Sequence, residues 1–149
     1  MRRQDLEHLI RAAGDIADDC EIIVIGSQAI LGEYPMAPSD LLVSMEADVF
    51  PKNKPERWDL IDGSIGEGSP FHKTFGYYAQ GVSADTAVLP AGWRDRLLAI
   101  CGANTRGITG WCLETHDLII SKLVAGREKD LRFFQDALRA GIVDRAKLH

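Results

Sequence analysis

A short run of β-branched residues ends directly at a Gly-Ser pair, and this arrangement limits the folds open to the chain. Residues 21–25 (Glu-Ile-Ile-Val-Ile) predict a strand buried on both faces, because such strands are almost continuously apolar. Gly26 and Ser27 follow at once, and residues 28–31 can begin a helix. Glycine lets a backbone approach an anion, and the free amides of a helix N-terminus bind phosphate. The pattern predicts a phosphate-binding turn; the alternative is that Ser27 only caps the helix.

Two carboxylates occupy alternate positions in the next strand candidate, residues 41–50. Glu46 and Asp48 are separated by one residue, so on a strand both side chains point to the same face. Such a pair repels itself unless a cation lies between the two groups, and Mg²⁺ is usually held by one or two carboxylates plus substrate phosphates. The spacing predicts a magnesium site close to the Gly-Ser turn. The alternative is a strand face that is merely acidic.

The rest of the pattern predicts a single α+β domain over residues 1–149, with a short mixed sheet, flanking helices and a C-terminal helical pair. Connections between the strands are too irregular for repeated βαβ units, and Gly63, Gly66 and Gly68 indicate a loop. The clearest expected elements are helices at 3–17, 114–125 and 128–140 and strands at 21–25, 41–50, 77–89 and 96–100.

Composition narrows the class of protein. A hydrophobic share of 46% with 26% charged residues is typical of a soluble globular domain, and no stretch reaches the roughly 20 apolar residues of a membrane span. The first residues lack the apolar segment of a secretory signal, so we expect a cytoplasmic protein without a membrane partner. The net charge of −5 gives no general attraction to nucleic acid. Three widely separated cysteines predict no disulfides and small buried side chains: Cys20, Cys101 and Cys112.

Basic residues gather near the C-terminus. Lys122 lies away from the apolar face of the helix expected at 114–125. If that helix continues through Gly126, Lys129 falls almost in line with Lys122, whereas Arg127 projects about 140° away. A lysine is a mobile point charge suited to a triphosphate. The alternative is a solvated charged helix in which Asp130 pairs with Arg127 or Lys129.

Aromatic residues and histidines give weaker signals. Phe71, Phe75, Tyr77 and Tyr78 form a cluster that either stacks a base or packs in the core. His116 near the start of a helix is expected at the surface.

Taken together, these motifs resemble the polymerase-beta-like nucleotidyltransferase superfamily, in which a strand ending in Gly-Gly or Gly-Ser is followed by an Asp-x-Asp or Glu variant on the next strand. The chain is most similar to small bacterial domains of unknown function grouped with the AbiEii-like toxin nucleotidyltransferases. The most specific part of the likeness is the stretch Asp117 to Asp130. The similar segments are Val24–Gly32, Ser44–Phe50, Ser69–Gly81, Leu89–Arg96 and Asp117–Leu131.

The resemblance implies roles for particular residues. A helix lysine that contacts nucleotide phosphates corresponds to Lys122, and a later active-site aspartate corresponds to Asp130. A third carboxylate is expected on a strand beside Glu46 and Asp48; Asp85 is the best candidate for it, with a loop aspartate as an equal alternative. The chain also departs from the usual pattern, because the gap from Ser27 to Glu46 is long and the first acidic residue is Glu.

Two functions follow as hypotheses. The first is a Mg²⁺-dependent nucleotidyltransferase that moves a nucleotide from a nucleoside triphosphate to RNA, a protein or a small molecule, as a toxin–antitoxin component or otherwise. Its expected catalytic residues are Glu46, Asp48, Lys122 and Asp130, its nucleotide-binding residues Gly26, Ser27, Lys122 and Lys129, and its metal ligands Glu46, Asp48 and Asp85. The second is a non-catalytic protein of the same fold that binds a nucleotide or a protein partner, such as an antitoxin.

Overall fold

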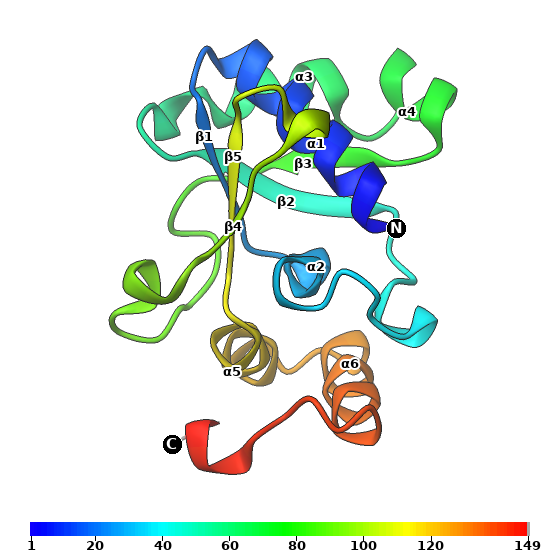
Figure 1. Cartoon of the computed structure of the whole chain (residues 1–149), viewed down its shortest axis with the longest axis vertical. Coiled ribbons are helices and arrows are strands. Elements are labelled where there is room, and N and C mark those ends of the chain that lie inside the picture. The colour runs from blue at the N-terminus through cyan, green and yellow to red at the C-terminus, as the bar shows by residue number, and fades with distance from the viewer. Residues whose placement is uncertain (149) are drawn as a thin grey trace.

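A five-stranded mixed sheet forms the centre of the protein, with strand order β3-β2-β1-β5-β4 (Figure 1). The computed structural model describes residues 1–148. The strands are β1 Glu21–Val24, β2 Glu46–Pro51, β3 Tyr78–Gly81, β4 Leu98–Ile100 and β5 Thr109–Cys112. The α-helices are α1 Arg3–Ala17, α2 Ile30–Glu33, α3 Trp58–Ile65, α4 Pro70–Phe75, α5 Thr115–Ala125 and α6 Glu128–Arg139. The predicted α+β fold with a C-terminal helical pair is therefore confirmed.

The central strand β1 is buried on both faces, as its β-branched run predicts. It pairs antiparallel with β2 and parallel with β5, while β3 runs parallel to β2 and β4 antiparallel to β5. Alternate residues point to opposite faces. Ile22 and Val24 enter the main core with the apolar stripe of α1, whereas Ile23 and Ile25 join a smaller cluster on the other face.

Several predicted strands are shorter in the structure. The candidate at 41–50 begins only at Glu46, because Leu41 lies in a 3₁₀ turn and its carbonyl accepts a hydrogen bond from the Gln28 side chain. The candidate at 77–89 is reduced to β3, an edge strand that pairs with residues Glu46–Val49 of β2.

The region between β2 and β3 contains more helix than the sequence pattern predicts. Gly63 belongs to α3 rather than to a loop. Helix α4 is an addition to the predicted elements: Ser69 caps its N-terminus by accepting a hydrogen bond from the His72 amide, and Pro70 occupies its first position. Both are ordinary helix-start signals.

The helices are divided between the sheet face and one end of the sheet. Helices α1 and α3 pack against the sheet, and α5 and α6 lie next to each other beyond α2, on the side where β1 ends (Figure 1). This end of the sheet thus collects the Gly26-Ser27 turn and the basic C-terminal residues. No helix in residues 1–148 is both long and apolar enough to cross a bilayer.

The cysteines differ from the prediction in their exposure. All three are free thiols, but only Cys112 is buried; Cys20 and Cys101 are exposed.

Candidate active site

A cleft of about 990 Å³ opens at the end of β1. Its walls come from the turn after β1, from β2, from β3 and the loop that follows it, and from the α5–α6 hairpin. Six of the eight site residues predicted from the sequence line it: Gly26, Ser27, Glu46, Asp48, Lys122 and Lys129. Asp85 and Asp130 do not.

The two carboxylates of β2 lie side by side in this cleft. As the spacing predicts, Glu46 and Asp48 share one face of the strand, while Ala47 and Val49 point into the core. Burial, followed by the neighbouring Glu46 carboxyl, raises the pKa of Asp48 to about 7, against the opposing effect of the Lys122 and Lys129 charges. A neighbouring carboxylate disfavours ionisation of Asp48 because the two negative charges repel each other.

One oxygen of Asp48 lacks a partner. Its Oδ1 atom is buried and accepts no hydrogen bond within residues 1–148. A buried acceptor without a partner is costly, because it has lost its hydration and gained nothing. An oxygen-rich pair with an unsatisfied atom fits Mg²⁺, so Glu46 and Asp48 are suitable as its ligands.

The Gly-Ser turn approaches Asp48 closely. The Ile25 amide donates to the Asp48 carbonyl over 3.0 Å, which places Gly26 directly over the side chain of Asp48. A Cβ atom on Gly26 would lie 2.7 Å from Asp48 Oδ2, so a side chain at this position would displace the Asp48 carboxylate. The Ser27 hydroxyl accepts a bond from the Gln28 side chain, and Gly26, not Ser27, occupies the cap position of the short 3₁₀ turn that precedes α2. The alternative that Ser27 serves as an N-cap is therefore wrong.

Lys122 reaches the cleft from α5 and is held there by a buried ion pair. Its Nζ lies 3.4 Å from Asp130 Oδ1 and 5.6 Å from the centre of the Phe133 ring. Arg127 pairs with the other oxygen of Asp130, with Nε 2.6 Å from Oδ2. Asp130 is fully buried, and it also accepts the Arg127 amide in a capping box at the start of α6.

These contacts change the interpretation of Asp130. The resemblance implies an active-site aspartate, but the structure places Asp130 behind Lys122 and outside the cleft lining. The ion pair with Arg127 that the alternative predicts is present, but Asp130 is buried and does not lie on a solvated helix face. Asp130 therefore positions Lys122 and Arg127, and its own oxygens face these two cations.

The path of the chain between α5 and α6 also differs from the prediction. Gly126 adopts a left-handed conformation with φ +65° and ends α5, so the helix does not continue to Lys129. Lys129 still lines the cleft, because α6 folds back on α5. The expectation that Arg127 points away from Lys122 is wrong: both contact Asp130 and both line the cleft.

The third carboxylate is not where the sequence placed it. Asp85 lies in the exposed loop after β3 and accepts a bond from the Ser83 hydroxyl at 2.8 Å. No three Asp, Glu, His or Cys side chains within residues 1–148 gather as ligands for a metal ion, so Asp85 does not join Glu46 and Asp48. Gln80, which no pattern in the sequence singles out, pairs with Asp48 in the β2–β3 register and lines the cleft.

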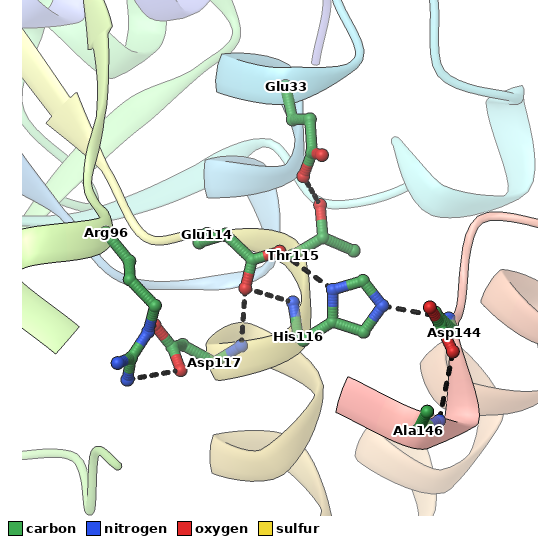
Figure 2. Close-up of polar contacts among 8 residues, drawn as sticks. All are labelled: Glu33, Arg96, Glu114, Thr115, His116, Asp117, Asp144 and Ala146. Atoms are coloured by element: carbon green, nitrogen blue, oxygen red, sulfur yellow. Dashed lines mark hydrogen bonds and ion pairs between the residues drawn. The ribbon is translucent and has the colours of Figure 1, made fainter. Parts of the chain in front are cut away.

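The N-terminal end of α5 is fixed by a network of polar contacts (Figure 2). Glu114 caps the helix by accepting the amides of His116 and Asp117. Asp117 also forms a two-bonded ion pair with Arg96, at 2.8 and 2.9 Å, and Thr115 donates to Glu33 of α2. Helix α5, which carries Lys122, is thus tied to α2, the helix that follows the Gly-Ser turn.

His116 connects the same helix end to the C-terminal segment. The prediction of a surface residue is wrong, because His116 is buried and both ring nitrogens are engaged (Figure 2). The Asp144 amide can only donate, so Nε2 accepts and Nδ1 carries the proton that is shared with Glu114. Both ring nitrogens are therefore used in structural hydrogen bonds, and neither is available to a substrate.

The raised pKa of Asp48 predicts a specific pH dependence. The unfolded chain loses this proton near pH 4, about three units below the folded protein. Stability from this group is therefore complete below about pH 4 and is lost as the pH rises through about 7. With a chelator present, the free energy of unfolding should fall less for Asp48→Asn than for wild type as the pH rises over this range. Urea denaturation at several pH values checks this, and parallel profiles for the two proteins would contradict it.

Comparison with known proteins gives one finding on family. A family model described as "Nucleotidyltransferase of unknown function (DUF6036)" matches residues 4–149. Searches of curated proteins and of solved structures returned no match. The match covers almost the whole chain, including the Gly-Ser turn, the β2 carboxylates and the α5–α6 hairpin. The chain belongs to this family of nucleotidyltransferases of unknown function.

Proposed function

We propose that the protein transfers a nucleotide from a Mg²⁺-bound nucleoside triphosphate to an acceptor hydroxyl in the cleft at the end of β1. The observation that carries the proposal is the convergence of three groups in one cleft: the Gly26-Ser27 turn, the Glu46–Asp48 pair and Lys122. Each group is common alone. Together they provide the phosphate, metal and charge-compensating contacts that phosphoryl transfer requires.

Gly26 and Ser27 bind the β and γ phosphates in this proposal. Gly26 lines the cleft without a side chain, and the Ser27 hydroxyl, which accepts from Gln28, can donate its own proton to a phosphate oxygen. Glu46 and Asp48 would hold Mg²⁺, which when bound neutralises phosphate charge and orients the triphosphate.

Lys122 compensates the negative charge that develops on the leaving pyrophosphate. Its position is fixed by Asp130, so little reorganisation accompanies the reaction. One of the two carboxylates accepts the proton of the attacking hydroxyl in this proposal.

Incorporation of nucleotide labelled at the α-phosphate tests the proposal, with each of the four triphosphates and with total RNA, protein and small-molecule fractions as acceptors. Lys122→Ala should reduce nucleotide affinity or the transfer rate by about tenfold to a hundredfold, because charge-assisted contacts contribute roughly 1.5–3 kcal/mol. Lys73→Ala is the control: this exposed lysine of α4 lies outside the cleft lining. Equal responses of the two variants would remove Lys122 from the site.

Nucleotide labelling combined with thermal denaturation in the presence of nucleotide separates the second hypothesis. Asp85 is absent from the cleft, and Gln80, a neutral amide, stands opposite Asp48. The site therefore has two carboxylates where three are expected. If nucleotide raises the melting temperature but no acceptor is labelled, the protein is a non-catalytic nucleotide-binding protein.

A further inference from the structure

The edge strand β3 runs beside the carboxylate pair in a matching register. Tyr78 pairs with Glu46 and Gln80 with Asp48. Because the strands are parallel neighbours, residues paired in this way project from the same face of the sheet. Tyr78 therefore stands next to Glu46, and its hydroxyl donates a 2.8 Å hydrogen bond to Glu46 Oε2.

Tyr78 is itself held firmly. Its ring packs on the imidazole of His72 in α4, with ring centroids 4.5 Å apart and planes inclined at 44°. The donor is thus supplied from a fixed ring and not from a mobile side chain.

This contact makes the two carboxylates of the cleft unequal. Glu46 has one oxygen engaged by a neutral donor, which limits its rotation, whereas Asp48 retains a buried oxygen without a partner. Two adjacent carboxylates would otherwise turn apart to reduce their repulsion. A fixed Glu46 keeps its second oxygen available beside Asp48.

We propose that Tyr78 is a positioning residue of the metal site, one that holds Glu46 in the orientation needed to share a divalent cation with Asp48. The inference rests on the proposed function, since it assumes that these two carboxylates bind the cation. The proposed role belongs to the Tyr78 hydroxyl alone, because a phenylalanine ring at this position would still pack on His72.

The test is the affinity of the full chain for Mn²⁺, measured by calorimetry and by the loss of the free-ion paramagnetic resonance signal. Groups that orient a metal ligand typically change metal affinity by about 10- to 100-fold when removed, so Tyr78→Phe should weaken Mn²⁺ binding by that factor. Tyr77→Phe is the matched control. The Tyr77 hydroxyl bonds to His8 Nδ1 at 2.7 Å, away from the cleft, so each variant loses one hydroxyl and one hydrogen bond.

A structural role alone would lower the melting temperature of both variants and leave Mn²⁺ affinity unchanged. Weaker Mn²⁺ binding in Tyr78→Phe, with Tyr77→Phe like wild type, supports the positioning role. Equal affinity of Tyr78→Phe and wild type overturns it, provided that Glu46→Gln does weaken binding. If wild type binds no Mn²⁺, or if Glu46→Gln binds it as well as wild type does, the metal site fails and the proposed function fails with it.

Discussion

Replacing Asp130 by alanine is expected to lower the free energy of unfolding by about 3 kcal/mol, the lower end of the range for breaking a buried ion pair. Asp130 has no exposed surface, and its partner Lys122 has a side chain only 14% exposed, so the variant removes the ion-pair partner of a largely buried cation. The larger end of the range is not expected, because the Arg127 side chain is 58% exposed and can be hydrated again.

The pH dependence of this effect has a definite sign. Burial alone would raise the pKa of Asp130, but the hydrogen bond from Arg127 and the charge of Lys122 hold it below its usual value. Its contribution is therefore present above the pKa of the unfolded chain and is lost as the pH falls through the folded value. Urea denaturation should show the difference between Asp130→Ala and wild type shrinking in acid.

Glu128→Ala is the control on the same helix. Glu128 is 91% exposed and pairs with Arg132 at 3.4 Å, an arrangement that contributes about 1 kcal/mol or less. If the two variants were equally stable, Asp130 would not be a buried anchor, and its assignment as the residue that positions Lys122 would be wrong.

The parts of the fold that the sequence predicts well are those set by local periodicity. The apolar spacing of residues 3–17 predicts helix α1, and the β-branched run before Gly26 becomes the central strand. The alternation of Glu46 and Asp48 places both in the cleft for the same reason: side-chain direction on a strand depends only on parity.

The failed predictions depend on contacts between distant segments. Whether β3 offers Gln80 or Asp85 to the carboxylate pair is decided by the β2–β3 register and by where β3 ends, and no local pattern encodes either. Gly126 is different, because its signal was present in the sequence. A glycine directly after the last helical residue is a common signal for the end of a helix.

Gly26→Ala is expected to lower the affinity for Mg²⁺-nucleotide, or the rate of transfer, by about a hundredfold while the protein still folds. The backbone at Gly26, with φ −76° and ψ −172°, is accessible to alanine, so conformational strain is not the cause. The cause is space. The new methyl group would lie 2.7 Å from Asp48 Oδ2 and 2.9 Å from its Cγ, so the carboxylate must move. A displacement near 1 Å at a reacting centre can cost about a hundredfold.

Gly63→Ala provides the matched comparison, because a Cβ at Gly63 in α3 meets nothing within 4 Å. There the added methyl group should stabilise the helix by about 0.5–1 kcal/mol and leave nucleotide affinity unchanged. Calorimetric titration with Mg²⁺-nucleotide and thermal denaturation of both variants separate the two effects. If Gly26→Ala bound nucleotide as tightly as Gly63→Ala, Asp48 would tolerate displacement, and the close approach of the turn to the carboxylate would have no part in binding.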